Sequence, residues 1–222
     1  MQRLPLIIGQ EPPRSHDPLP ERPYCYPGTD VLLNLEGIRD AKTLAQFEVQ
    51  TASVNIARFA ISPITGPFDA SRLKETHRRI FGNVYPWAGE FRQGIGMMTK
   101  DRSGFVVAYG PSENVPAALA ATFAALNAEN GLRGLDADRF AARLAFYCSE
   151  LDAIHAFREG NSRTLRAFTS DLSQAAGHRL DWARAALVPD DQQRLYHARD
   201  LAVMRGDTSE LARIVASCLS TG

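Results

Sequence analysis

Residues 155–166 read HAFREGNSRTLR and lie between two stretches with helical apolar spacing. The first stretch carries Phe140, Leu144, Tyr147, Leu151 and Ile154, and the second carries Leu165, Phe168, Leu172 and Ala176 and ends at Gly177. Because the apolar residues recur every three or four positions, both stretches are predicted to be amphipathic helices that face a common core. Residues 155–166 are therefore predicted to be a loop that leads into the start of the second helix.

The small residues of this loop predict an anion site. Gly160, Asn161 and Ser162 allow a tight bend that would direct free backbone N–H groups and the helix dipole at one point. Arg163 and Arg166 are three residues apart on the same helix, and their guanidinium groups match phosphate oxygens. Together these residues predict a site for a polyphosphate.

Two further side chains of the loop add chemistry to this site. Glu159 offers a hard oxygen ligand that suits Mg²⁺ when phosphates and water complete the coordination. His155 has an ordinary pKa of about 6.5, which suits proton removal from a hydroxyl near neutral pH. Each feature alone is more often structural, so the ordered combination is what favours a functional site.

The rest of the chain is predicted to be mainly helical with one β-hairpin. Glycines between residues 87 and 111 interrupt the runs EFRQ and GFVVAY, which favour extended structure. Helices are predicted over residues 38–61 and 69–81, along the apolar stripe in residues 115–126, and after Pro189.

Bulk composition limits the class of protein. The 222 residues are 45% hydrophobic, which is enough for one main domain. Lys plus Arg and Asp plus Glu are both 25, so no net charge favours nucleic acid or an acidic membrane. The apolar runs are too short for a signal peptide or a membrane span. Cys25, Cys148 and Cys218 are odd in number and widely spaced, which fits a reducing cytosol.

The loop resembles the Fic-family signature H-P-F-x-D/E-G-N-G-R-x-x-R. It departs from this signature at two fixed places, where Ala156 replaces the proline and Ser162 replaces the second glycine. Residues 26–48, YPGTDVLLNLEGIRDAKTLAQFE, and residues 80–92, IFGNVYPWAGEFR, are similar to the N-terminal helix and pre-flap segments of bacterial Fic toxins and effector Fic domains. The resemblance extends over residues 26–178.

The resemblance implies a mainly α, Fic-type helical bundle with a β-hairpin flap over the active site. It implies three parts: an extended N-terminal arm at residues 1–25, a Fic catalytic domain at 26–190, and C-terminal helices at 191–222 packed on the same domain. The implied cofactors are ATP and Mg²⁺.

The resemblance also implies roles for the loop residues. His155 would deprotonate the target hydroxyl, Glu159 would hold Mg²⁺, and Asn161 with neighbouring amides would bind the α- and β-phosphates. Arg163 and Arg166 would meet the outer phosphates. The flap would border the nucleotide and dock the target protein by strand addition. The implied nucleotide-binding residues are Gly160, Asn161, Ser162, Arg163, Arg166, Met97, Met98, Thr99 and Lys100.

The implied reaction transfers AMP from ATP to a Ser, Thr or Tyr hydroxyl of a target protein and releases pyrophosphate. Two alternatives stay open: a Doc-like phosphotransferase that uses the same site, and a catalytically decayed Fic-fold binding protein. The Ala156 departure would loosen the backbone after the base. The Cβ of Ser162 would require room, so weaker nucleotide binding is expected.

Self-inhibition in this family uses a helix with the pattern S/T-x-x-x-E-G/N. The nearest segments, residues 32–37 and 125–130, lack the hydroxyl residue. We therefore expect the toxin half of a bacterial toxin–antitoxin pair, restrained by a small antitoxin whose glutamate lies against Arg166. A bacterial cytoplasmic location is expected, with delivery into another cell as the alternative.

Other aromatic and histidine residues are expected to be structural. Tyr85 and Trp87 are predicted to form a buried aromatic cluster rather than a base-stacking pair. His77, His178 and His197 show no metal-ligand spacing, so they are predicted to be surface or helix-end histidines.

Overall fold

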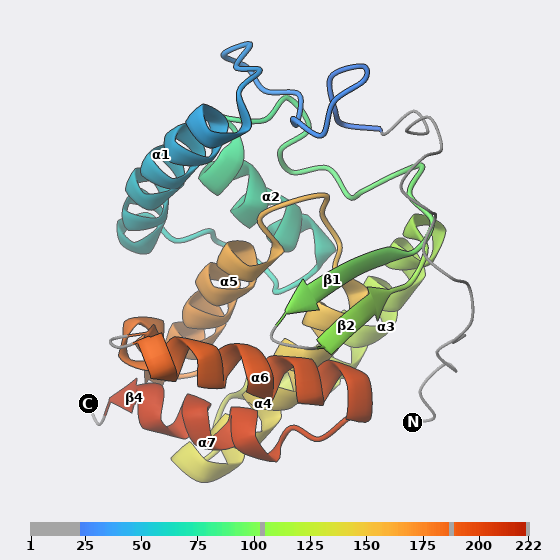
Figure 1. Ribbon diagram of the computed structural model, residues 1–222. Helices are drawn as coiled ribbons and strands as arrows, with labels where there is room; N and C mark the ends of the chain where they lie inside the picture. The colour runs from blue at the N-terminus through green and yellow to red at the C-terminus, as the bar shows by residue number, and fades with distance from the viewer. Residues whose placement is uncertain (1–22, 103–104, 187–188, 221–222) are drawn as a thin grey trace.

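The computed structural model describes residues 23–102, 105–186 and 189–220, and this part of the chain is mainly helical (Figure 1). The helices are α1 Ala41–Ile61, α2 Ala70–Phe81, α3 Val115–Ala128, α4 Ala137–Ile154, α5 Asn161–Ala175, α6 Pro189–Arg205 and α7 Ser209–Cys218. Two antiparallel strand pairs accompany them, β1 Met98–Arg102 with β2 Phe105–Tyr109, and β3 Arg179–Leu180 with β4 Leu219–Ser220. The predicted mainly α fold with a β-hairpin is confirmed.

Three of the helices begin at an aspartate whose side chain accepts a backbone N–H. Asp40 caps α1, Asp69 caps α2 and Asp136 caps α4, each with a donor–acceptor distance of 2.8 or 2.9 Å. The helix α5 begins differently, because its N-cap is Gly160 and no side chain caps it. The amides of its first turn therefore have no capping side chain.

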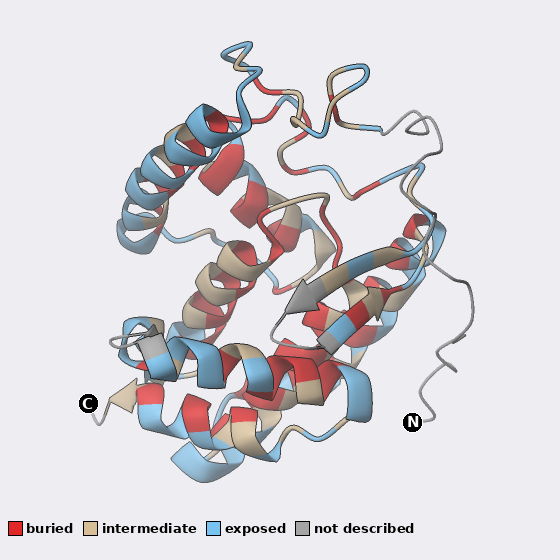
Figure 2. Ribbon diagram, in the orientation of Figure 1, coloured by how far each residue is buried: buried red, intermediate tan, exposed pale blue. Residues whose placement is uncertain are grey.

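The main core lies between α4, α5 and the helices around them. Phe140 and Leu144 of α4 and Phe168 of α5 are fully buried there. Figure 2 shows buried residues along α4 and α5, whereas much of α1 is exposed. A buried ion pair joins α2 to α5, since Arg72 Nη2 lies 2.7 Å from Asp171 Oδ2. This pair helps to set the position of α5 relative to α2.

A smaller core lies between α1, α2 and the segment that follows α2. Tyr85 and Trp87 are buried in it, with ring centroids 4.4 Å apart and rings inclined by 15°. The predicted buried aromatic cluster is confirmed. The three cysteines are free thiols and are also buried.

One predicted strand is wrong. The run EFRQ, residues 90–93, is not a strand, and β1 begins only at Met98. The backbone N–H of Arg92 instead donates to the carbonyl of Ala156 at 2.9 Å, so this run is bonded to the loop 155–160 rather than to a sheet.

Most of the predicted N-terminal arm, residues 1–25, lies outside the described residues, and the boundaries predicted at 25 and 190 stay predictions. Within the described part, Cys25 forms a β-bridge with Leu32. Across residues 23–102, 105–186 and 189–220, no helix has the length and apolar character that a membrane span requires.

Candidate active site

The side chain of His155 is buried where α4 ends. The residue is the C-cap of α4 and has a φ of 48°, in the left-handed region, which turns the chain out of the helix. Its ring stacks on Tyr109 of β2 at a centroid distance of 3.8 Å and is inclined by 19°. Among the described residues, neither ring nitrogen has a hydrogen-bond partner. A nitrogen of this ring is therefore available to accept a proton.

Burial and nearby cations keep this imidazole neutral. Burial lowers the pKa of His155 to about 3. The positive charges of Lys100, Arg199 and Arg92 act in the same direction, and the carboxylate of Asp152 acts to raise this pKa. The Asp152 Oδ1 atom lies 4.0 Å from Nδ1, which is too long for a hydrogen bond. The two side chains are therefore a neutral imidazole beside a carboxylate rather than an ion pair.

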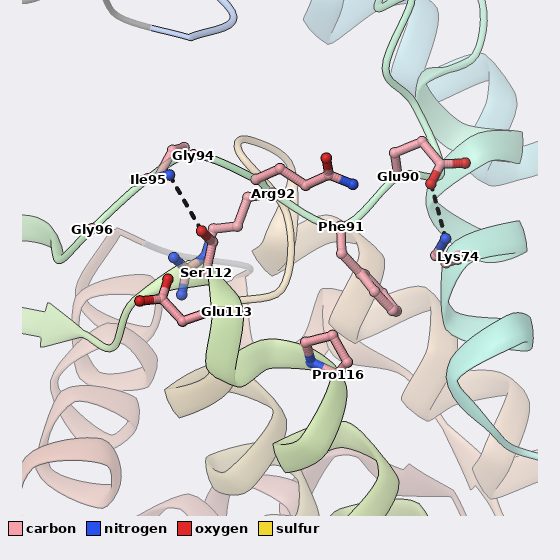
Figure 3. A pocket seen from close by; sticks show the side chains of 11 residues that line it. Lys74, Glu90, Phe91, Arg92, Gly94, Ile95, Gly96, Ser112, Glu113 and Pro116 are labelled. Atoms are coloured by element: carbon pink, nitrogen blue, oxygen red, sulfur yellow. Dashed lines mark hydrogen bonds and ion pairs between the residues drawn. The ribbon is translucent and has the colours of Figure 1, made fainter.

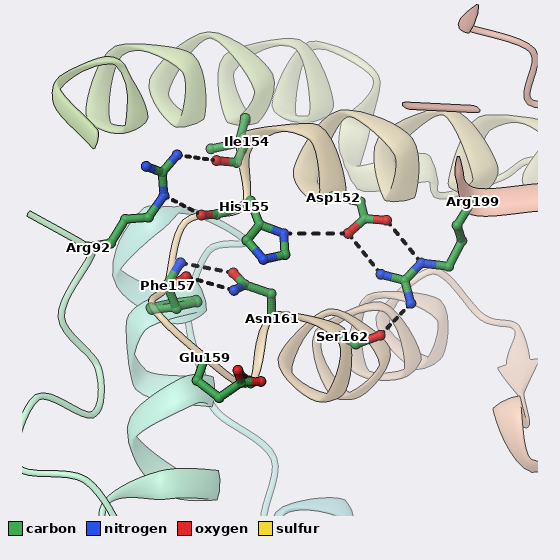
Figure 4. Close-up of polar contacts among 10 residues, drawn as sticks. Arg92, Asp152, Ile154, His155, Phe157, Glu159, Asn161, Ser162 and Arg199 are labelled. Atoms are coloured by element: carbon green, nitrogen blue, oxygen red, sulfur yellow. Dashed lines mark hydrogen bonds and ion pairs between the residues drawn. The ribbon is translucent and has the colours of Figure 1, made fainter. Parts of the chain in front are cut away.

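Arg92 holds the backbone around His155. Its Nε donates to the carbonyl of His155 at 2.7 Å and its Nη2 to that of Ile154 at 3.3 Å. With its backbone bond to Ala156, Arg92 contacts three consecutive carbonyls. Figure 4 shows the two side-chain bonds. This buried arginine, which sequence reasoning missed, restricts the loop at the place where alanine replaces the signature proline.

Asn161 closes the other end of the loop. Its Oδ1 accepts from the N–H of Phe157 at 2.9 Å, and its Nδ2 donates to the carbonyl of Phe157 at 2.7 Å (Figure 4). The side chain therefore shapes the loop. Because the side-chain amide is used within the loop, the predicted contact of Asn161 with phosphate would be made by its backbone N–H.

Glycine is required at position 160 for two reasons. Its φ is 78°, which favours glycine, and a Cβ at this position would lie 2.3 Å from Cε2 of Phe81. The bend therefore places the start of α5 directly against α2. The carbonyl of Gly160 accepts the first helical bond, from the N–H of Thr164 at 3.0 Å.

The prediction of a surface or helix-end position is wrong for His77, which is fully buried in α2. The N–H of Gly89 donates to its Nδ1 at 2.8 Å, so Nε2 must carry the proton that is donated to the carbonyl of Glu159 at 3.0 Å. Burial lowers the pKa of His77 to about 4. Its place between Leu73 and Ile80 on the apolar side of α2 was the available sequence signal.

Glu159 lies at the entrance to α5. Its Oε1 accepts from the N–H of Gly160 at 2.9 Å, and its side chain is 34% exposed. The carboxylate is thus beside the uncapped helix start, partly exposed to solvent and 3.9 Å from Nη2 of Arg163.

The two predicted phosphate-binding arginines have different neighbours. Arg163 forms an ion pair with Glu48 of α1, and its guanidinium lies 4.8 Å from the centre of the Phe81 ring. Arg166 forms no ion pair with the described residues, and burial together with the charge of Arg199 lowers its pKa. Arg166 is therefore the arginine available for an anion, and phosphate contact by Arg163 stays a prediction.

Arg199 of α6 is a further cation that sequence reasoning missed. Its Nε and Nη2 donate to the two carboxylate oxygens of Asp152 at 3.0 and 2.8 Å, and its Nη1 donates to Oγ of Ser162 (Figure 4). It is 7% exposed. Only its place near the apolar residues Leu195 and Ala198 hinted at burial. The network links α4, α5 and α6 beside His155.

The predicted flap residues lie in or next to the hairpin whose Tyr109 stacks on His155. Met98, Thr99 and Lys100 are in β1, and Met97 directly precedes this strand and is 53% exposed. Lys100 lies close enough to affect the pKa of His155. The hairpin thus covers the buried imidazole.

The donor set fits a magnesium nucleotide. No cluster of three or more His, Cys, Asp or Glu residues that could hold a metal occurs in the part of the chain that the structure describes. Mg²⁺ bound with phosphates needs only one or two protein carboxylates. Glu159 supplies one such carboxylate, and the uncapped start of α5 and Arg166 offer donors to the phosphates.

A separate groove of about 800 Å³ lies between the segment before β1 and the start of α3 (Figure 3). Its walls contain the Lys74–Glu90 ion pair, at 2.9 Å, and the bond from the N–H of Ile95 to Oγ of Ser112, at 3.3 Å. None of residues 155–166 lines it. The groove is therefore distinct from the predicted nucleotide site at the start of α5.

The chain is similar to several known proteins. The family model described as Fic/DOC family matches residues 67–172. Protein adenylyltransferase VbhT of Bartonella schoenbuchensis is 40% identical over 73% of this chain, which spans only 33% of VbhT. Probable protein adenylyltransferase y4lH of Sinorhizobium fredii is 36% identical, over 72% of this chain and 80% of that protein. Probable protein adenylyltransferase Fic of Salmonella typhimurium is 30% identical, over 89% of this chain and 92% of that protein.

Solved structures share the fold. The BepC protein of Bartonella tribocorum, a VirB-translocated effector with bound AMPPNP, has a TM-score of 0.79 and 26% identity over 90% of this chain and 97% of that chain. The N-terminal Fic domain of a Bartonella quintana effector with bound ADP also has a TM-score of 0.79, with 27% identity over 89% of this chain and 94% of that chain.

Proposed function

Because the chain belongs to the Fic/DOC family, we propose that it transfers AMP from ATP to a hydroxyl side chain of a target protein. The observation that carries this proposal is a neutral, buried imidazole beside an uncapped helix start. The names of the adenylyltransferase relatives and the nucleotides in two similar structures support it.

The residues have separate roles in this reaction. The target oxygen forms a bond to the α-phosphorus, the bond from this phosphorus to the bridging oxygen breaks, and pyrophosphate leaves. A ring nitrogen of His155 takes the hydroxyl proton. The backbone N–H groups at the start of α5 and the guanidinium of Arg166 offset the phosphate charge. Glu159 would hold Mg²⁺, which supplies further charge neutralisation when bound.

The flap would complete the site. Met97, Met98, Thr99 and Lys100 border the nucleotide in this proposal, and the hairpin docks a segment of the target by strand addition. Since Tyr109 covers the imidazole, the target hydroxyl can reach His155 only if the hairpin shifts or the hydroxyl enters along its edge.

Labelled ATP tests the reaction. A lysate incubated with α-³²P-ATP and Mg²⁺ should show a labelled target protein with the native chain and none with His155→Ala. His197→Ala removes an exposed histidine of α6 and is the matched control, which should keep the label. Label from γ-³²P-ATP instead would support the Doc-like phosphotransferase, and nucleotide binding without either label would support a decayed binding protein.

We also propose a separate antitoxin as the source of restraint, as in a bacterial toxin–antitoxin pair. Glu129, in one of the two segments nearest to the self-inhibitory pattern, is bonded to Arg143 and Tyr147 instead. Arg166 has no carboxylate partner in the described part of the chain, so a supplied glutamate could pair with it. Arg166→Gly should weaken inhibition by a glutamate-bearing helix, and unchanged inhibition would contradict this pairing.

The site of action follows from the same proposal. We place it in the bacterial cytoplasm, and delivery into another cell is the alternative that the translocated Bartonella proteins raise.

A further inference from the structure

We propose that the hydroxyl of Ser162 donates a hydrogen bond to a phosphate of the nucleotide, and that Arg199 is the residue that positions this hydroxyl. The inference rests on the proposed function, because it concerns the same site. It reverses the expectation that serine at this place weakens nucleotide binding.

The direction of the hydrogen bonds follows from the donor and acceptor properties of the two groups. A guanidinium can only donate, so Oγ of Ser162 must accept the bond from Nη1 of Arg199. The hydroxyl proton of Ser162 therefore points away from Arg199 and can be donated to another acceptor. Among the described residues no group accepts it. An incoming phosphate oxygen, which can only accept, is a suitable partner.

Arg199 is fixed firmly enough to position this hydroxyl. Both oxygens of Asp152 accept from it, at 3.0 and 2.8 Å, and the ion pair is buried with side-chain exposures of 8% and 2%. The paired geometry leaves Nη1 directed at Ser162 (Figure 4). The hydroxyl is therefore held at the start of α5 by Arg199 of α6, which Asp152 of α4 holds in turn.

The location of Ser162 suits a phosphate contact. It is the second residue of α5, in the first turn, where the helix has no side-chain cap. It is only partly buried, whereas Arg199 behind it is buried. A hydroxyl in this position would add one directed donor to the backbone N–H groups of the turn.

The size of the effect follows from the type of bond. A hydrogen bond to a charged group corresponds to a change in dissociation constant of roughly ten- to a hundredfold. Ser162→Ala should therefore weaken binding of Mg-ATP by at least about tenfold. Ser162→Thr keeps the hydroxyl and should stay close to native. Ser162→Gly restores the signature glycine but should also bind more weakly.

A structural role for the same contact makes a different prediction. If Ser162 served only to satisfy Arg199, Ser162→Ala would lower the stability of the fold and leave the dissociation constant of Mg-ATP unchanged. Arg199→Lys separates the two roles further, because its effect on binding should largely vanish in the Ser162→Ala background. The unfolding midpoint of each variant shows whether the fold is retained.

Isothermal titration of the full chain with Mg-ATP decides the matter, with Ser53→Ala on the exposed face of α1 as the matched control. Weaker binding by Ser162→Ala, with native-like binding by Ser162→Thr and Ser53→Ala, supports the proposal. Native-like binding by Ser162→Ala would overturn it and leave the proposed function standing. Failure of the native chain to bind ATP would overturn both. If Arg199→Lys does not fold, the Ser162 series alone decides.

Discussion

Replacement of Gly160 by alanine should destabilise the protein by about 2–5 kcal/mol. Two costs add at this position. An L-residue in the left-handed region costs about 1–2 kcal/mol, and the φ of Gly160 is 78°. The new Cβ would lie 2.3 and 2.5 Å from Cε2 and Cζ of Phe81, and relief of such overpacking typically costs about 1–3 kcal/mol.

Gly177, just beyond the other end of α5, separates the two costs. Its φ is 90°, but a Cβ there would have no atom within 4 Å. Gly177→Ala should therefore show only the conformational cost, about 1–2 kcal/mol. The difference between the two variants in urea unfolding, followed by circular dichroism, measures the contact with Phe81.

Phe81→Leu, alone and combined with Gly160→Ala, tests whether Phe81 causes the second cost. The smaller side chain should relieve part of the contact, so the cost of Gly160→Ala should fall in the Phe81→Leu background. Equal losses for Gly160→Ala and Gly177→Ala, with no coupling to Phe81→Leu, would refute the reasoning. Gly160→Ala should also weaken Mg-ATP binding, because relief of the contact shifts the start of α5.

Three other predictions concern buried groups. Asp171→Asn leaves the guanidinium of Arg72 unpaired in the core and should cost about 3–5 kcal/mol in urea unfolding; a loss below about 1 kcal/mol would contradict a buried pair. Burial lowers the pKa of His77 from about 6.5 in the unfolded chain to about 4 in the folded chain. As the pH drops, the unfolded chain therefore binds the proton first, and the free energy of unfolding falls between about pH 6.5 and about pH 4. His77→Phe should reduce this pH slope by about one proton, and an unchanged slope would refute the assignment. Burial raises the pKa of the Cys148 thiol to about 12, so iodoacetamide should label it only after unfolding, and rapid labelling of the folded chain would contradict its burial.

Local sequence signals predicted the elements and the loop well. Asp40 and Asp69 marked helix starts because a cap depends on residues only three positions away. The apolar stripes of α4 and α5 predicted both helices and placed residues 155–160 between them. Such signals depend on spacing along the chain, so they can be read without the fold.

Contacts between distant residues could not be predicted in this way. Glu48 of α1 forms an ion pair with Arg163 of α5, and the sequence around either residue does not indicate the partner. The run EFRQ favours extended structure locally, yet the backbone of Arg92 bonds to Ala156. His77 shows the same limit, because both of its hydrogen-bond partners lie outside α2.

The two departures from the signature show why these distant contacts matter. A proline at position 156 would restrict the backbone after the base by its ring. Here alanine stands at that place, and Arg92 donates to the carbonyls of Ile154, of the base itself and of the alanine. At position 162 serine stands in place of glycine, and Arg199 bonds its hydroxyl. Both arginines lie outside residues 155–166, so two mismatches within the signature do not imply a decayed site. The integrity of such a loop has to be judged from the side chains that the fold brings to it.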